Sequence, residues 1–327
     1  MASNFSDKTI LVTGGSGSLG HELTEYLQSN FPPQKLIIFS RDEMKQFDMA
    51  KLFSQKNVQF ILGDVRDKDS LKRACANVDY IIHAAAIKHV SSAEYNPFEA
   101  VKTNILGAQN VIDCAVEAGV QKVVALSTDK AVNPVNLYGA TKLCADKIFL
   151  AGNAYSEGKT QFSIVRYGNV VGSRGSVVPI FLEKRKTGTL PVTDERMTRF
   201  WISLRQSVQF ILRSMDRMLG GEVFVPKLPS MRVVDLAKAI APECRLEVVG
   251  IRPGEKLHET LISEFDSRHT YEYDDFFVIL PDYEWYQLNE WQLKGGKVVE
   301  NFSYSSVENS HWLDSEAISK ILETLPV

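Results

Sequence analysis

Short apolar runs rich in β-branched residues alternate with longer amphipathic segments through the first half of the chain. Six such runs precede residue 170, at Thr9–Val12, Lys35–Phe39, Val58–Leu62, Val78–Ile82, Lys122–Leu126 and Phe162–Val165. Continuous apolar strands separated by helical patterns are typical of a parallel sheet covered by helices on both faces. Because the crossovers of such a sheet are right-handed, we predict an α/β fold with a doubly wound parallel sheet. Its ligand crevice should lie at the carboxyl ends of the strands.

The alternation ends near residue 170, where a Gly/Ser/Arg-rich segment and mixed short elements follow. We therefore expect a nucleotide-binding domain over residues 1–170, with residues 200–225 packing on it. Residues 171–199 and 226–327 are expected to form a smaller substrate-binding portion. The run Tyr271–Phe277 is interpreted as an edge strand with a solvated acidic face.

The formal net charge of the 327-residue chain is −3, which gives no electrostatic reason to expect nucleic acid or an anionic membrane as a partner. The start of the chain is polar, without a basic-then-apolar signal, and no run of about 18 apolar residues occurs, so a cytoplasmic location is expected. The four cysteines form no C-x-x-C pair and the six histidines have no metal-binding spacing. We therefore expect reduced thiols and no metal site.

A glycine-rich loop, TGGSGSLG at residues 13–20, follows the first apolar run and opens a helical pattern. Its glycines permit a tight turn, a close approach of the backbone to a pyrophosphate and close packing of the helix. This context predicts a dinucleotide at the helix N-terminus. The expected contacts in the loop are Gly14, Ser16, Gly17, Ser18, Leu19 and Gly20.

The second apolar run ends at Ser40-Arg41-Asp42, where the ribose of the dinucleotide is expected. Ser40 and Arg41 suit a 2′-phosphate and favour NADP, whereas Asp42 as a ligand of the ribose hydroxyl would favour NAD. Residues after the third run are positioned to meet adenine, and small residues after the fourth leave space for the dinucleotide. The further expected contacts are Lys45, Asp64, Val65, Ala84, Ala85 and Ala86.

Tyr138 and Lys142 lie four residues apart in a helical pattern, so their side chains point the same way. An ammonium beside a phenol lowers its pKa and allows it to act as a base, which is typical of an oxidoreductase. Asp129 and Lys130, just ahead of this pair, add a proton donor and a second base. Simple hydride transfer does not require these two residues, whereas elimination from a sugar does.

Nearly the whole chain resembles the extended short-chain dehydrogenase/reductases and, more narrowly, the soluble, configuration-inverting UDP-N-acetylglucosamine 4,6-dehydratases that open the pseudaminic acid pathway. The resemblance includes the glycine loop, Ser40–Glu43, Gly63–Asp67, His83–Ala86, Lys88–Val90, Glu94–Pro97, Ser127–Lys130, Tyr138–Lys142, Arg166–Val170, Met197–Trp201 and Arg252–Lys256. The glycine loop and the Tyr/Lys pair indicate only the superfamily. The Asp129-Lys130 dyad and the last two motifs are more specific.

The resemblance implies a mechanism in which Tyr138 removes the proton of the sugar 4-hydroxyl while C4 loses a hydride, and Lys142 holds the ribose. Lys130 then removes the hydrogen on C5, Asp129 protonates the leaving 6-hydroxyl, and Thr128 stabilises the oxygen at C4. Retaining relatives carry Glu in place of Lys130, which points to inversion at C5 and an L-arabino product.

The resemblance also implies a homo-oligomer, a hexamer, that binds NADP and UDP-N-acetylglucosamine. It adds Asn104, which is expected to brace the catalytic helix, together with Leu126 and Ser127 on the cofactor side. The implied substrate-binding residues are Lys88, Asn169, Arg174, Thr193, Met197, Arg252 and Glu255.

Three other functions remain open at this stage. A nucleotide-sugar 4-epimerase would share every motif except the need for Asp129 and Lys130. A dehydratase of capsule synthesis would also epimerise C5. A non-catalytic NADP-sensing regulator would use the glycine loop but has no use for the pair Tyr138 and Lys142.

Overall fold

The computed structural model describes residues 5–172, 177–283, 286 and 292–323. Its centre is a ten-stranded sheet in the order β16-β14-β15-β10-β6-β5-β4-β1-β2-β3. The six predicted strands are all present, and they are β1 (Thr9–Thr13), β2 (Lys35–Ser40), β3 (Val58–Leu62), β4 (Tyr80–His83), β5 (Lys122–Thr128) and β6 (Gln161–Tyr167). They pair in parallel, as does β10 (Val223–Pro226) with β6. The predicted doubly wound α/β fold is therefore confirmed.

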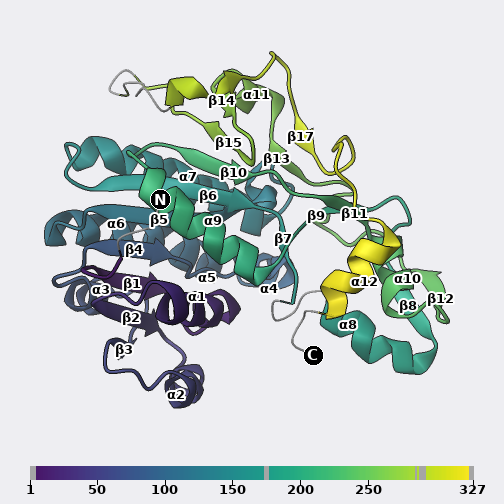
Figure 1. Ribbon diagram of the computed structural model, residues 1–327, viewed down its shortest axis with the longest axis horizontal. Coiled ribbons are helices and arrows are strands. Elements are labelled where there is room, and N and C mark those ends of the chain that lie inside the picture. The colour runs from purple at the N-terminus through teal and green to yellow at the C-terminus, as the bar shows by residue number, and fades with distance from the viewer. Residues whose placement is uncertain (1–4, 173–176, 284–285, 287–291, 324–327) are drawn as a thin grey trace.

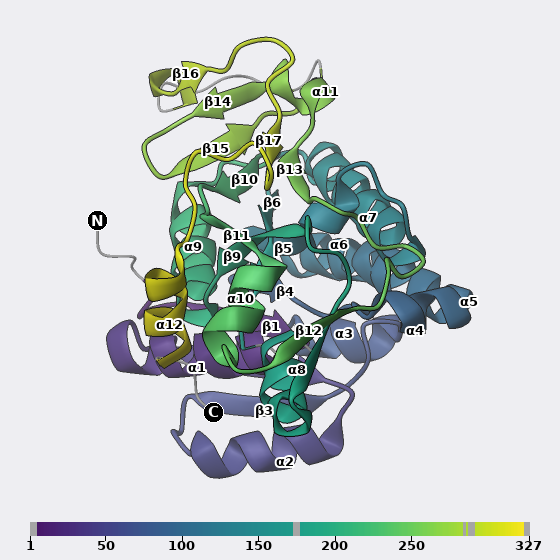
Figure 2. The same cartoon turned by 90° about the vertical axis from the view of Figure 1, so that its right-hand side faces the viewer.

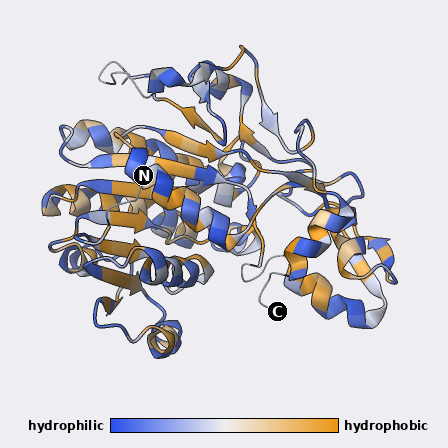
Figure 3. Ribbon diagram, viewed as in Figure 1, coloured by the Kyte–Doolittle hydropathy of each residue, from blue (hydrophilic) through white to orange (hydrophobic). Residues whose placement is uncertain are grey.

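Helices cover both faces of this sheet (Figures 1 and 2). On one face α1 (Ser18–Asn30) packs against α9 (Leu204–Arg217). The other face carries α3 (Lys68–Ala74), α6 (Gly107–Ala118) and α7 (Leu137–Tyr155), which pack in that order. The strands are apolar and the outer helix faces are polar, as Figure 3 shows, because only the strands are buried on both sides. The remaining helices at this end are α2 (Glu43–Leu52), α4 (Val90–Tyr95) and α5 (Pro97–Val101).

Strand order reverses between β1 and β4, so the crossovers from these two strands leave in opposite directions and open a crevice at their carboxyl ends. The glycine loop follows β1, and Ala84 follows β4. The sheet therefore places both predicted cofactor segments at one switch point.

The far edge of the sheet is antiparallel. Strand β15 (Phe276–Ile279) pairs with β10 and with β14 (Thr270–Glu272), and β16 (Gly296–Lys297) pairs with β14. The interpretation of Tyr271–Phe277 as one edge strand was wrong, because this run is a hairpin in which the Tyr273 N–H donates to the Phe276 carbonyl (2.9 Å). Phe276 and Phe277 are buried and cover the end of the parallel sheet.

A second, smaller apolar cluster lies beside the carboxyl ends of the parallel strands, where Val178, Phe181, Leu190 and Leu236 are buried together. Its elements are β7 (Asn169–Val170), α8 (Val177–Lys184), β8 (Thr189–Val192), β9 (Thr198–Ile202), β11 (Ser230–Arg232), α10 (Val233–Ile240), β12 (Arg245–Val248) and α12 (Ser315–Glu323). Two strands, β13 (Thr260–Ile262) and β17 (Tyr304–Ser305), form an antiparallel pair that connects this cluster to the main sheet. The division at residue 170 stays a prediction.

The short elements that complete the chain are a π-helical turn η1 (Lys102–Leu106), 3-10 turns η2 (Asp129–Ala131), η3 (Arg185–Thr187) and η4 (Gln292–Lys294), and α11 (Glu264–Ser267). Within the described ranges, no helix has the length and apolar character that crossing a membrane requires.

Candidate active site

Two positions of the glycine loop, Gly14 and Gly20, have no room for a side chain. Gly14 has a φ of +69°, and a Cβ atom there would lie 2.8 Å from the Ala85 backbone, so the β1 and β4 crossovers touch. A Cβ atom at Gly20 would lie 1.9 Å from the Gly15 carbonyl oxygen, so the first turn of α1 packs on the loop. At Gly17 the nearest atom would be 3.3 Å away. Packing within the protein does not require that glycine, and the first N–H groups of α1 are of the kind that bind a pyrophosphate.

The predicted ribose site after β2 is a hydrogen-bonded corner. Ser40 is buried, and its hydroxyl accepts from Ser16 Oγ and from Gln46 Nε2, each at 2.9 Å. Asp42 caps α2 by accepting from the backbone N–H of Lys45 (3.0 Å), and its carboxylate also pairs with Lys45 Nζ (2.6 Å). Asp42 therefore has a structural task at the helix start.

Arg41 is the exposed cation of this corner, with its Nη1 atom 3.7 Å from Asp64 Oδ2. Partial burial tends to raise the pKa of the Asp64 carboxyl, but hydrogen bonds from Arg66 outweigh it and hold that pKa below its ordinary value. Asp64 thus stays ionised beside Arg41. Val65, the next residue, is buried against Gly107 of α6.

Asn104 joins the segment after β4 to the helix that carries Tyr138. Its Oδ1 accepts from the Ile87 N–H (2.8 Å), and its Nδ2 donates to the Ile87 carbonyl (3.0 Å) and to Thr141 Oγ1 of α7 (2.9 Å). Asn104 lies in the π-helical turn η1, and its side chain is buried. Ala84 and Ala85 are half-buried in this segment, whereas Ala86 is exposed.

At the end of β5, Leu126 and Ser127 are buried. Ser127 Oγ donates to Asp146 Oδ2 (2.6 Å), a carboxylate one helical turn after Lys142 on α7. Burial lowers the pKa of Lys142 and raises that of Asp146. The two groups therefore lie in the same desolvated space behind the Tyr138 turn.

The first turn of α7 is fixed by three contacts. Asn136 caps the helix by accepting from the Gly139 N–H (2.7 Å), and Glu94 of α4 accepts from the Leu137 N–H (2.7 Å). A Cβ atom at Gly139 would lie 2.0 Å from the Lys130 carbonyl oxygen, so only glycine allows α7 to pack this closely on η2. Tyr138 is thereby brought beside Lys130.

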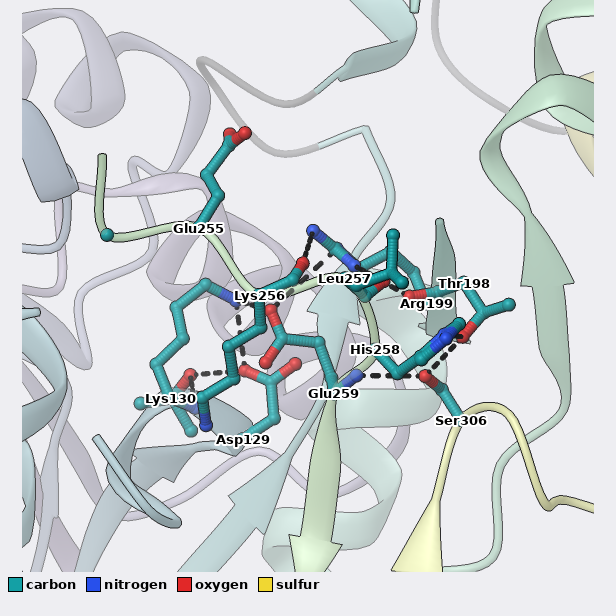
Figure 4. A network of polar contacts seen from close by, with 12 residues as sticks. Asp129, Lys130, Thr198, Arg199, Glu255, Lys256, Leu257, His258, Glu259 and Ser306 are labelled. Atoms are coloured by element: carbon teal, nitrogen blue, oxygen red, sulfur yellow. Dashed lines mark hydrogen bonds and ion pairs between the residues drawn. The ribbon is translucent and has the colours of Figure 1, made fainter. Parts of the chain in front are cut away.

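Lys130 Nζ is held between two buried carboxylates (Figure 4). It donates to Asp129 Oδ1 (3.1 Å) and to Glu259 Oε1 (3.2 Å), and Thr128 Oγ1 donates to Asp129 Oδ1 (2.8 Å). The carboxylate side chains are only 1% and 2% exposed. Burial alone would lower the pKa of Lys130, but the two carboxylates outweigh it and raise that pKa above its ordinary range. Lys130 is therefore an ammonium at neutral pH in this structure.

Tyr138 is half-buried in the cleft. Burial raises its pKa to about 12, while the Lys130 ammonium and the Thr128 hydroxyl act in the opposite direction. The sequence predicted that Lys142 lowers this pKa, but in the structure Lys130 is the cation with the larger effect.

The predicted substrate-binding residues lie on several elements and connecting segments. Lys88, Asn169 and Arg252 are exposed, Thr193 and Glu255 are half-buried, and Arg252 Nη1 lies 4.0 Å from Glu255 Oε1. Met197 is buried in the second apolar cluster. Arg174 lies outside the described residues.

Sequence reasoning missed Glu259 and Asn136. Asn136 Nδ2 donates to the Gly254 carbonyl (2.7 Å), and Lys256 Nζ donates to the Val132 carbonyl, so the Arg252–Lys256 motif is tied to the start of α7. Ligand-binding residues are expected at the carboxyl ends of the parallel strands, and Glu259 does not follow such a strand. The one signal for Glu259 in the sequence is that it lies three residues after the Arg252–Lys256 motif.

Within residues 5–172, 177–283, 286 and 292–323, no group of His, Cys, Asp or Glu side chains is arranged to hold a metal ion. The ionisable side chains gathered here are the phenol of Tyr138, the amines of Lys130 and Lys142, and the buried carboxylates of Asp129 and Glu259.

The whole chain is similar to known proteins. Residues 10–281 match the family described as polysaccharide biosynthesis protein, and the chain belongs to that family. It is 53% identical to a protein of Campylobacter jejuni named UDP-N-acetylglucosamine 4,6-dehydratase (inverting), over 97% of this chain and 98% of the relative. The resemblance seen in the sequence is thereby confirmed.

Two further similar proteins carry other names. A Rickettsia akari protein named UDP-glucose 4-epimerase is 38% identical over 98% of this chain and 97% of its own length. The crystal structure of Pen from Bacillus thuringiensis is 36% identical, has a TM-score of 0.89, and is covered over 98% of both chains. The whole architecture is therefore shared with a solved structure, including the substrate side.

Proposed function

We propose that this protein is an NADP-dependent, configuration-inverting UDP-N-acetylglucosamine 4,6-dehydratase. The observation that carries the proposal is the buried contact between Asp129 and Lys130 at the end of β5, beside Tyr138. Oxidation at C4 needs Tyr138 and Lys142 only. A second acid and a second base, desolvated in the same cleft, are what elimination of water across C5 and C6 requires. The name of the Campylobacter relative supports UDP-N-acetylglucosamine as the substrate.

The crevice between β1 and β4 would hold the cofactor. Gly17 and the first N–H groups of α1 suit the pyrophosphate, and the Arg41 guanidinium suits a 2′-phosphate. A bound nicotinamide would supply a hydride acceptor for C4 and a hydride donor for C6, and its positive charge would favour the Tyr138 phenolate. Lys45, Asn104 and the residues after β3, β4 and β5 complete the proposed contacts.

Tyr138 is the proposed base for the 4-hydroxyl. With a pKa of about 12 it is a neutral phenol at pH 7, so it must lose its proton before it can accept one. The Lys130 ammonium lowers this cost, because it stabilises the negative phenolate across a desolvated gap. Lys142, one turn further along α7, is placed to bind the ribose and add a second positive charge.

Elimination then needs Lys130 as a neutral amine and Asp129 as a carboxylic acid. Moving one proton from Lys130 to Asp129 produces both forms, because their contact is 3.1 Å long. Lys130 takes the proton from C5, which the 4-ketone has made acidic, and Asp129 gives its proton to O6 as water leaves. A proton is then restored at C5 on the opposite face, which gives the L-arabino product. The enzyme gains protons from O4 and C5 and returns one to O6 and one to C5, so the proton count balances.

The test is to mix the purified protein with UDP-N-acetylglucosamine in heavy water, without added NADP(H), and to record product mass and proton NMR. The expected product has lost one water, carries deuterium at C5 and has the L-arabino configuration. A sugar of unchanged mass that is inverted at C4 would instead support the 4-epimerase function named for the Rickettsia relative. A D-xylo product would contradict inversion.

The same resemblance supports two finer proposals. The product would enter pseudaminic acid biosynthesis, and the protein would assemble as a homo-hexamer. Light scattering on the purified protein tests the assembly, and a monomer or dimer at micromolar concentration would contradict it.

A further inference from the structure

Glu259 lies 129 residues after Lys130 in the sequence, yet their side chains meet at 3.2 Å inside the cleft. It precedes β13, in the region that connects the second apolar cluster to the main sheet. Figure 4 shows its carboxylate directed at the dyad, whereas Glu255 of the same segment points away. Glu259 is thus the member of the predicted substrate portion that reaches the proposed base.

The backbone of Glu259 is clamped on both sides. Its N–H donates to Ser306 Oγ (2.9 Å), and its carbonyl accepts from the Ser306 N–H (2.8 Å). Ser306 Oγ is in turn 2.7 Å from Thr198 Oγ1, which also contacts His258 Nδ1 (2.8 Å). The backbone that carries the Glu259 side chain is therefore held by a buried network.

The cluster balances its charges. Arg199 Nε lies 3.7 Å from Glu259 Oε1, and Arg199 also donates to the backbone carbonyls of Lys256 and Leu257. Two carboxylates, Asp129 and Glu259, are thereby paired with two cations. Burying a second carboxylate beside Asp129 is costly unless it is paired in this way. Such a cost is tolerated where the group has a task.

Each of the two carboxylates has one oxygen atom without a hydrogen-bond partner among the described residues. Asp129 Oδ2 and Glu259 Oε2 belong to a small set of buried side-chain atoms that have no hydrogen-bond partner in the part of the chain that the structure describes. A buried carboxylate oxygen with no protein partner is an expected place for a reacting or bound group. Because Asp129 Oδ1 accepts from Lys130 Nζ and from Thr128 Oγ1, the proton of the neutral acid has to rest on Oδ2, from which it can pass to O6.

The contacts of Lys130 Nζ determine the direction in which the lone pair of its neutral amine points. A neutral lysine has two N–H groups and one lone pair, which rotate freely about the Cε–Nζ bond unless both N–H groups are bound. Asp129 Oδ1 and Glu259 Oε1 are placed to accept one N–H each. The lone pair is then left in the third direction. With Asp129 alone, this rotation would not be fixed.

Resting on the proposed dehydratase function, we propose that Glu259 is a positioning residue that orients the Lys130 amine for removal of the C5 proton. It accepts one N–H of Lys130 throughout the elimination and does not itself touch the substrate. It therefore acts on the C5 step and leaves the transfer of hydride from C4 unaffected.

The experiment compares Glu259→Leu with Glu259→Gln, which keeps an acceptor oxygen. Two rates are followed with UDP-N-acetylglucosamine in heavy water: the appearance of reduced-nicotinamide absorbance, which reports C4 oxidation, and the incorporation of deuterium at C5. Misplacement of a reacting group by about 1 Å costs about 100-fold. Glu259→Leu is therefore expected to slow C5 exchange about 100-fold while oxidation at C4 persists. Glu259→Gln is expected to recover most of the C5 rate.

The pH profile of Glu259→Gln gives a second readout. The charged and titratable groups that face Lys130 are Asp129, Glu259, Tyr138, Arg199 and Lys256. Removing one of the two carboxylates that stabilise the ammonium lowers the pKa of Lys130. The neutral amine then persists to lower pH, so the acidic limb of the C5 exchange profile shifts to lower pH. A merely structural Glu259 would leave this limb in place.

A matched control is Glu222→Gln, which also replaces a buried carboxylate, but Glu222 directly precedes β10, away from the carboxyl ends of the parallel strands, and accepts from Ser163 Oγ (2.6 Å). It is expected to leave the ratio of the two rates unchanged. An unchanged ratio in Glu259→Leu, or an unshifted limb in Glu259→Gln, would overturn the role of Glu259. If the wild-type protein neither loses water nor exchanges C5, the proposed function itself fails.

Discussion

The cofactor side and the elimination side of this cleft are built by opposite means. Around Gly14 and Gly20 the site is formed by leaving side chains out, so that backbone segments approach each other closely. Around Lys130 it is formed by burying charges together, with two carboxylates and Arg199 in one desolvated cluster. Changes on the first side should act through shape and affinity, whereas changes on the second should act through proton transfer.

The two sides also differ in how their parts are brought together. The cofactor side uses the turns that directly follow β1, β2, β3 and β4, which a parallel sheet places side by side. The elimination side joins β5, α7, β9, the Arg252–Lys256 segment and Ser306, which are distant in sequence. A polar network assembled over such distances must be correct at every contact to function.

The largest effect is expected for Lys130→Ala, which removes the proposed base. C5 exchange should fall by about 1,000-fold or more, because a positioned base contributes about 10² to 10⁴ in rate. Reduced nicotinamide should still form, since Tyr138 and Lys142 remain, but more slowly, because the Lys130 ammonium no longer stabilises the Tyr138 phenolate. The measurement is deuterium incorporation at C5 by NMR, and exchange at the wild-type rate would remove Lys130 from its assigned role.

A large effect is also expected for Gly139→Ala, which tests whether α7 must touch η2. The added Cβ atom would lie 2.0 Å from the Lys130 carbonyl oxygen, so the helix has to move away and take Tyr138 with it. We expect kcat to fall about 100-fold and stability to fall by about 1–3 kcal/mol. Gly296→Ala is the control, since nothing lies within 4 Å of its Cβ position. Wild-type kcat in Gly139→Ala would show that this close packing is dispensable.

A smaller, selective effect is expected on the cofactor side for Arg41→Ala. If the guanidinium binds a 2′-phosphate, the Kd for NADP should rise about tenfold or more while the Kd for NAD changes little. Titration calorimetry with both dinucleotides measures this difference. Lys51→Ala serves as a control, because Lys51 is an exposed cation that pairs with Asp48 on α2. Equal losses for NAD and NADP would mean that Arg41 does not recognise the phosphate.

The smallest effect is on stability and concerns His83, the last residue of β4. Burial lowers its pKa to about 3, and its Nδ1 lies 2.8 Å from Thr13 Oγ1. The unfolded chain binds a proton at His83 below about pH 6.5, whereas the folded protein does not, so stability falls as the pH falls. This residue should cost about 1 kcal/mol between pH 7 and pH 5.5. Urea unfolding at both pH values should show a smaller difference in His83→Gln, and an equal difference would contradict the prediction.

Much of the cofactor side could be predicted from the sequence because its information is local. The apolar runs gave the six parallel strands, and the glycine pattern placed the loop at the first crossover. The ends of strands were less well predicted, since β5 continues to Thr128 and its last two residues, Ser127 and Thr128, are polar although buried.

The elimination side was only half predictable. Asp129 and Lys130 stand out because they follow a strand, but nothing local indicates that Glu259 joins them. Tyr271–Phe277 shows the same limit: alternation and charge suggested one strand, while its tertiary packing folds the run into a hairpin with both phenylalanines buried. Contacts across more than a hundred residues leave no period in the sequence.

Asn136 has a consequence for protein engineering. Its amide holds the first turn of the catalytic helix with its oxygen and the Gly254 carbonyl with its nitrogen. Grafting the Arg252–Lys256 loop from a relative with another sugar preference would therefore also transplant one support of the helix. A donor loop with another backbone conformation at position 254 would turn its carbonyl away from Asn136 and remove that support, so the loop and the helix start are best exchanged together.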